Sequence, residues 1–133
     1  MNIGKTTSYA IKVLSYMALN KNDIHSASSL YNGLKFPHQY LRQILTSLSK
    51  KGYIKSSKGR KGGFVFAKDT KKIFIADIIL SFEGDDIFER CIIGYNNCIF
   101  ENKCAMHDTW VSSRNKILKE LKSTSLDKLL KKK

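Results

Sequence analysis

Residues 37–68 of the chain are PHQYLRQILTSLSKKGYIKSSKGRKGGFVFAK, a helical apolar pattern followed by two short strand-like runs. Pro37 suits the first turn of a helix that runs to about Lys51 and stops at Gly52. Residues 53–57 and 64–67 have the composition of β-strands, and the glycine-rich turn KGRKGG lies between them. We therefore predict a helix followed by a β-hairpin with a basic tip.

Two further helices are predicted upstream of this stretch. Apolar residues recur at helical spacing from Thr7 to Leu19, with Thr6 or Thr7 available as the cap. Ser26 can cap a short second helix that ends near Gly33. Three helices and a basic hairpin in this order predict a winged helix-turn-helix.

Downstream, a short helix is expected around residues 75–82 and a long helix from about residue 106 to residue 122. The tail can add a short turn of helix after Ser125. An apolar stripe on the long helix is expected to face the same helix of a second subunit, because isologous dimers are the commonest assembly. The stripe consists of Trp110, Val111, Ile117, Leu118 and Leu121.

The predicted fold class is therefore mainly α with a small β-hairpin: a winged helix-turn-helix domain plus a long C-terminal dimerisation helix. Within this one structural domain we expect a DNA-binding part at residues 1–84, a cysteine-bearing cluster loop at 85–105, and the dimerisation helix with a basic tail at 106–133. No stretch is apolar enough for a spanning helix and the first residues do not resemble a secretory leader, so we expect a cytoplasmic protein.

The positive charge is concentrated in the first half of the chain. The 133 residues carry a net charge of +13, and residues 1–72 contain 14 Lys and Arg against two acids. A surface of this kind favours phosphate groups, because binding releases condensed counterions. A solubilising face is the ordinary alternative, whereas an anionic membrane would require the basic residues to lie along one amphipathic helix.

The outward face of the third predicted helix contains no acid and combines Gln with Arg. Gln can pair with adenine and Arg with guanine in the major groove, although polar residues on a helix exterior are more often plain surface. The following basic hairpin favours DNA, so double-stranded DNA is the expected partner. The predicted DNA-binding residues are His38, Gln39, Tyr40, Arg42, Gln43 and Lys50 on the helix, and Lys58, Arg60, Lys61 and Gly62 in the turn.

The three cysteines lie within fourteen residues in the pattern C-x6-C-x5-C-x2-H, formed by Cys91, Cys98, Cys104 and His107. Thiolate and imidazole ligands suit zinc, iron or an iron–sulfur cluster. Structural zinc sites usually contain a tight cysteine pair, which is absent here, and the wider spacing favours a [2Fe–2S] or [4Fe–4S] cluster. Three buried cysteines, a thiol redox switch with Cys91 next to Arg90, and a zinc-stabilised loop stay open as alternatives.

The combination of a winged helix-turn-helix pattern with this cysteine pattern resembles the IscR/NsrR-type bacterial transcription regulators. These are winged-helix homodimers that sense iron–sulfur status, nitric oxide or redox state. The resemblance rests on SYAIKVLSYMAL, on residues 40–69, on IADIILSFEG, and on the cysteine pattern continued by His107-x2-Trp110. It implies a DNA-binding regulator, a repressor, controlled by a cluster that the purified protein can lack. No small-molecule substrate, membrane or enzymatic reaction is implied.

Two positions depart from the family pattern. Ser8 stands where some members carry an acidic cluster ligand from the partner subunit, which makes His107 the favoured fourth ligand. Arg42 stands where the branch that regulates cluster biosynthesis tends to have an acid. The resemblance therefore does not identify the operator.

Overall fold

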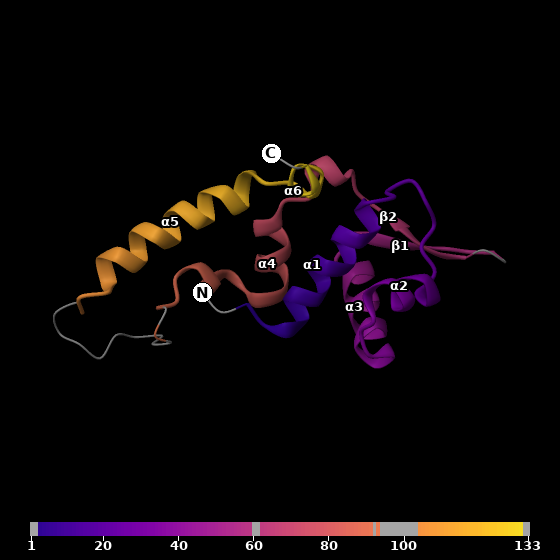
Figure 1. Ribbon diagram of the computed structural model, residues 1–133, viewed down its shortest axis with the longest axis horizontal. Coiled ribbons are helices and arrows are strands. Elements are labelled where there is room, and N and C mark those ends of the chain that lie inside the picture. Colours follow the sequence, from indigo (N-terminus) through magenta and orange to yellow (C-terminus); the bar gives the residue numbers. More distant parts are fainter. Residues whose placement is uncertain (1–2, 60–61, 92, 94–103, 132–133) are drawn as a thin grey trace.

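The computed structural model of the protein describes residues 3–59, 62–91, 93 and 104–131, and it confirms the predicted fold class. Helices form most of the described structure, and the two strands pair as an antiparallel hairpin (Figure 1). The elements are α1 Lys5–Ala18, α2 Ala27–Leu34, α3 His38–Lys50, β1 Ile54–Ser57, β2 Gly63–Phe66, η1 Thr70–Lys72, α4 Ile75–Glu83, η2 Asp85–Phe88, α5 His107–Ser123 and α6 Leu126–Leu130.

Side-chain caps begin three of the described helices, α2, η1 and α6. Ser26 caps α2 by accepting a hydrogen bond from the Ser29 backbone N–H at 3.0 Å, as predicted. Gly52 follows α3 with a φ of +83°, a conformation that glycine adopts without strain. The predicted Thr6 or Thr7 cap of α1 is wrong, because the helix already begins at Lys5. Thr7 instead lies inside the protein, where its hydroxyl donates to the Glu83 carboxylate at 2.8 Å.

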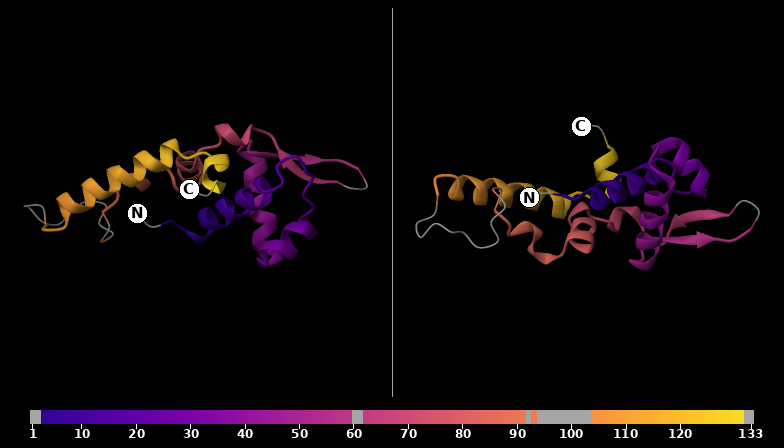
Figure 2. Two further views of the ribbon diagram at one scale, coloured as in Figure 1. Left: turned by 45° about the horizontal axis from the view of Figure 1, so that its top comes forward. Right: turned by 90° about the horizontal axis from the view of Figure 1, so that it is seen from below.

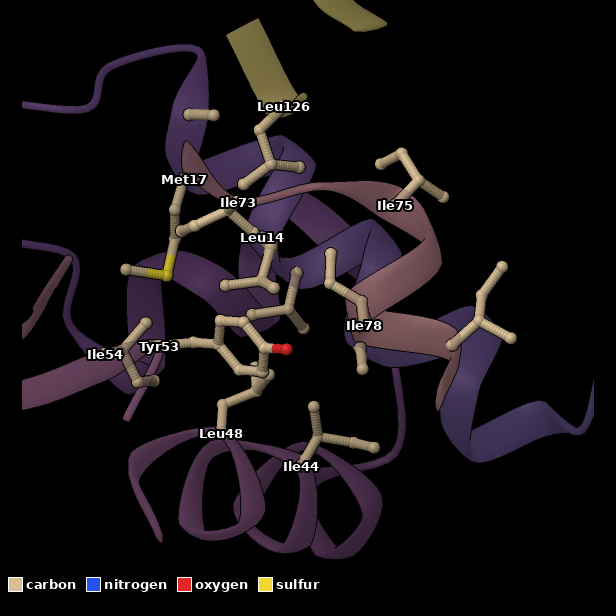
Figure 3. Packing of buried hydrophobic residues seen from close by; sticks show 14 of the residues in the cluster. Leu14, Met17, Ile44, Leu48, Tyr53, Ile54, Ile73, Ile75, Ile78 and Leu126 are labelled. Atoms are coloured by element: carbon tan, nitrogen blue, oxygen red, sulfur yellow. The ribbon is translucent and has the colours of Figure 1, made fainter. Parts of the chain in front are cut away.

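The core lies where α1, α3 and α4 meet (Figure 3). Leu14 and Met17 of α1 are completely buried, as are Leu48 of α3 and Ile78 of α4. Tyr53, in the turn after α3, points its ring into the middle of this cluster. Burial of these side chains supplies the main stabilisation and holds α3 with its polar face outward.

The hairpin is attached to the segment between α1 and α2. Ile54 pairs with Phe66, and Ser57 pairs with Gly63. Phe64 also exchanges two backbone hydrogen bonds with His25, of 2.9 and 2.8 Å. A Cβ atom on Gly63 would approach the His25 carbonyl oxygen to 2.5 Å, so this position requires glycine. The wing is therefore fixed at its base and projects from the domain (Figure 2).

After α5 the chain returns to the winged-helix part of the protein. α5 extends away from the helical core and contains no fully buried residue (Figures 1 and 2). α6 then packs on α1 and η1, with Leu126 completely buried. The Leu126 N–H donates to the Ile73 carbonyl at 2.9 Å, and the Ile75 N–H donates to the Thr124 carbonyl at 3.0 Å. The tail is thus part of the winged-helix core, whereas the sequence indicated only a short turn before a frayed end.

Candidate functional site

The polar face of α3 is open to solvent. Its inner face buries Leu41, Ile44, Leu45 and Leu48. The outward side chains predicted to contact DNA are all exposed: His38, Gln39, Tyr40, Arg42, Gln43 and Lys50. Because α3 contains no acid, this face offers hydrogen-bond donors and positive charge without a carboxylate to repel phosphate.

Arg42 stands between two hollows on this face. One hollow of about 440 Å³ is lined by Thr6 of α1 and by residues of α3, including Tyr40 and Gln43. The other, of about 410 Å³, lies between α3 and the wing and is lined by Lys50 and Phe64. Arg42 lines both hollows. Its guanidinium is therefore the most central cation on the α3 face.

Aromatic contacts restrain the start of α3. The His38 ring stacks on Tyr31 of α2 with ring centroids 3.6 Å apart and an interplanar angle of 14°. Tyr40 meets Tyr9 of α1 edge to face at 6.1 Å, and Tyr9 in turn stacks on Phe36 at 4.4 Å. These neighbours fix the positions of His38 and Tyr40 before any ligand arrives. The sequence analysis missed the supporting role of Tyr9, Tyr31 and Phe36, because it arises from contacts between helices.

The wing tip carries the other predicted DNA contacts. Lys58 is exposed, and the Gly62 N–H donates to the Gly59 carbonyl at 2.9 Å, which closes the turn. Arg60 and Lys61 lie outside the described residues, so their role stays a prediction. The described part of the hairpin and α3 occupy the same end of the molecule, opposite the start of α5 (Figure 1). This arrangement presents a helix and a wing together.

The cysteine segment lies at the other end. Cys91 and Cys104 are half-buried free thiols, and Cys98 lies outside the described residues. His107 is the first residue of α5, and its backbone N–H donates to the Cys104 carbonyl at 3.0 Å. The Cys91 sulfur accepts a hydrogen bond from the Ile93 N–H at 3.4 Å.

One side-chain bond holds the two ends of this segment together. The indole N–H of Trp110 donates to the Arg90 carbonyl at 2.9 Å. Arg90 precedes Cys91, and Trp110 lies one turn into α5 after His107. The Arg90 guanidinium also pairs with Asp86 at 3.1 Å, and this hydrogen bond lowers the pKa of the exposed Asp86 carboxyl. The residue before Cys91 is thus tied to the first turn of α5, which follows Cys104.

The donor chemistry of this segment fits an iron–sulfur cluster. Thiolates are the usual ligands of iron in such clusters, and imidazole replaces them in some. Within residues 3–59, 62–91, 93 and 104–131, no three His, Cys, Asp or Glu side chains gather into a metal site. The predicted ligand set includes Cys98, which lies outside those residues. The set of Cys91, Cys98, Cys104 and His107 therefore stays a prediction.

The apolar stripe of α5 is divided between two surfaces. Leu118 and Leu121 pack against the core of their own chain, and Trp110 and Val111 are half-buried. Ile117 is 43% exposed. Leu118 and Leu121 thus contact the core of their own subunit, and the role of the stripe in dimerisation stays a prediction. Among the described helices, none has the length and hydropathy to cross a bilayer.

Comparison with known proteins points to one family. The model of the Rrf2 family, described as iron-dependent transcriptional regulators, matches residues 3–132. A protein of Aquifex aeolicus named as an HTH-type transcriptional regulator is 32% identical over 132 residues, which cover 98% of this chain and 92% of that protein. The regulator NsrR of Oceanobacillus iheyensis is 26% identical over 133 residues, covering 98% and 90% of the two chains.

A second regulator name and a solved structure agree with this result. IscR of Xenorhabdus nematophila is 32% identical over 92 residues, which cover 69% of this chain and 56% of that protein. The structure of CymR, titled the global cysteine regulator of B. subtilis, superposes with a TM-score of 0.78 at 24% identity, covering 97% of this chain and 95% of CymR. The CymR structure supports the fold alone.

Proposed function

Since the chain belongs to the Rrf2 family of transcriptional regulators, we propose that it is a sequence-specific DNA-binding repressor whose affinity for DNA is set by an iron–sulfur cluster. The proposed ligands are Cys91, Cys98, Cys104 and His107. The carrying observation is the Trp110–Arg90 hydrogen bond, which ties the residue before Cys91 to the first turn of α5, where His107 lies. Relatives named NsrR and IscR add support for the cluster.

DNA binding follows from the exposed face of α3 and from the wing. The proposed arrangement inserts α3 into the major groove, where Arg42 and Gln43 hydrogen-bond to base edges. Lys50 and Lys58, with Arg60 and Lys61, neutralise phosphates on either side. A homodimer would present two such faces, and two half-sites about one helical turn apart would register any change in their separation.

The residues of the cysteine segment have separate tasks in this proposal. A bound cluster supplies a centre that reacts with oxidants and nitric oxide and is lost when iron is scarce. Trp110 ties the first turn of α5 to Arg90, the residue before Cys91. The Cys91 sulfur accepts a hydrogen bond from the Ile93 N–H. His107, the first residue of α5, would supply the one imidazole ligand. A single imidazole among thiolates makes the cluster easier to lose than one held by cysteines alone, and such lability suits a sensor.

The test is a visible absorption spectrum of protein purified without oxygen, with iron and sulfide assays. We expect charge-transfer bands in the visible and both elements in the wild type, and loss of both when Cys98 is replaced by Ser. Binding to a duplex selected from a random-sequence pool is then compared before and after cluster removal. A colourless, iron-free protein after anaerobic reconstitution would contradict the cluster.

A thiol redox switch is the second candidate. Cys91 and Cys104 are both free thiols at the two ends of a segment that Trp110 closes, so oxidation could join two of the three cysteines. Mass spectrometry after peroxide treatment detects such a disulfide as a loss of two mass units. Zinc in protein taken from untreated cells, without iron, would instead indicate a structural metal.

A further inference from the structure

The last turn of α4 is tied to the end of the recognition helix α3 by a lysine. Lys51 directly follows α3, and its ammonium donates to the Ser81 carbonyl of α4 at 2.7 Å. The same ammonium lies 4.9 Å from the centre of the Phe82 ring. Carbonyl groups at a helix C-terminus carry partial negative charge, so a cation there stabilises the helix end. The preceding Lys50 lines the hollow beside the wing instead.

The same turn of α4 is also tied to α1. The Glu83 carboxylate accepts hydrogen bonds from the Gly4 N–H at 3.3 Å and from the Thr7 hydroxyl at 2.8 Å. Thr7 is completely buried, so its hydroxyl could not turn to water if Glu83 moved. Displacement of this turn would therefore disturb both helices that set the angle of the DNA-reading face.

α4 leads directly to the cysteine segment. After Gly84 the chain enters η2, whose Ile87 and Phe88 are buried in the core. Arg90 follows, with its carbonyl bound by Trp110 of α5. Figure 1 shows α4 between the start of α5 and the end that carries α3 and the wing. A series of packed and hydrogen-bonded groups thus runs from Cys91 to Lys51, a contiguous network of the kind that can carry coupling between separated sites.

We propose that Lys51 is a positioning residue that makes the α3 face sense the state of the cysteine segment, through its bond to the last turn of α4. This inference rests on the proposed function, because it names how regulation reaches the DNA face. Lys51 does not act as a phosphate contact, since its ammonium is directed to α4. Loss of the ammonium leaves α3 folded on its buried leucines and isoleucine but removes the hydrogen bond that ties its end to the last turn of α4.

The coupling is measured as a ratio of DNA affinities. The ratio compares anaerobically reconstituted protein with the same protein after removal of the cluster by a chelator, on one duplex selected from a random pool by the wild type. Lys51→Met keeps the aliphatic stem and loses the bond. The exposed hydrogen bond to a charged donor accounts for about a fivefold change in this ratio, roughly 1 kcal/mol at 1.4 kcal/mol per tenfold.

Two further variants distinguish loss of the Lys51 contact from a general loss of positive charge or of folding. Lys51→Arg keeps a cation that can reach the Ser81 carbonyl, and it should retain most of the wild-type ratio. Lys72→Met removes the same charge at an exposed position of η1, where the structure describes no hydrogen bond or ion pair of the ammonium. Lys72→Met should change at most the overall affinity for DNA and should leave the ratio of the two affinities unchanged. A Lys51→Met protein with a normal cluster spectrum and the wild-type ratio would overturn the inference and leave the proposed function standing.

A second readout applies if the wild-type ratio is one, which would refute cluster control. The link through Lys51 is then tested in metal-free protein: coupling free energies are reciprocal, so if Lys51 joins α3 to the cysteine segment, bound DNA should alter the accessibility of the thiols. The alkylation rate of Cys91 and Cys104 by iodoacetamide is measured in reduced, metal-free protein with and without the duplex. We expect DNA to change this rate in the wild type and to change it far less in Lys51→Met. Equal effects in both proteins, or no effect in the wild type, would overturn the role of Lys51.

Discussion

Removal of the Leu126 side chain tests whether the C-terminal helix is part of the DNA-binding domain. Leu126 is completely buried against the core near Ile73, although it lies 53 positions further along the chain. Leu126→Ala removes the buried side chain and leaves a cavity, which costs about 2 to 5 kcal/mol in well-packed cores. The backbone bonds to Ile73 and Ile75 keep α6 in place and limit collapse around the cavity, so we expect about 3 kcal/mol.

The matched control is Leu129→Ala on the same helix, because Leu129 is 45% exposed. It loses the same atoms with little burial and should cost less than about 1 kcal/mol. Urea unfolding followed by circular dichroism measures both at one protein concentration, since assembly would shift the midpoint. For a chain of this length about 3 kcal/mol corresponds to a melting temperature lower by roughly 10 to 15 °C. Equal losses in the two variants would refute the integration of α6 into the winged-helix core.

Three other changes test the site and its electrostatics. Trp110→Phe loses the bond to the Arg90 carbonyl, worth about 1 kcal/mol, and should speed alkylation of the described thiols severalfold by mass spectrometry; an unchanged rate would count against loop closure. Arg42→Ala should relax base preference at one operator position at a cost of about 1 to 3 kcal/mol, as measured by binding to a panel of mutated duplexes, and uniform weakening on all duplexes would show that Arg42 contacts only phosphate. The hydrogen bond from Thr70 lowers the pKa of Asp127, so its carboxylate stabilises the fold above the unfolded pKa of about 3.9 and loses this effect as pH falls through the lower folded value. Asp127→Asn should therefore lower the melting temperature at neutral pH, with a gap from the wild type that closes in strong acid, and a gap independent of pH would contradict this.

Local patterns predicted α2, α3 and the hairpin well, because their signals are short-range. Ser26 is a good cap wherever it precedes a helix, and the apolar spacing from Leu41 to Leu48 places one face of α3 inward without any knowledge of its neighbours. Gly52 likewise ends α3 through its own backbone freedom. The outward face of α3 could be predicted for the same reason, because it is the face opposite the buried one.

Contacts between distant segments could not be predicted in this way. Thr7 was expected to cap α1, but its partner Glu83 lies 76 positions away. The burial of Leu126 depends on η1 and α1, and the sequence around it contains only a basic, leucine-bearing tail. The sequence also showed no sign that the indole N–H of Trp110 binds the Arg90 carbonyl within its own chain, and the role of Trp110 in a dimer stays a prediction. Each of these contacts involves a side chain whose partner is set by the tertiary fold.

The placement of α5 limits how the cysteine segment can influence DNA. Trp110 ties the start of α5 to the end of η2, and α6 anchors the chain beyond its last turn through Leu126. A helix held at both ends couples a displacement of its start to the segment that anchors its other end. If Ile117 and its exposed neighbours meet the same helix of a second subunit, a change at residues 91–104 would alter the angle between subunits. The Lys51 contact would at the same time adjust each α3 face within its own subunit, so the two routes should add in their effect on half-site spacing.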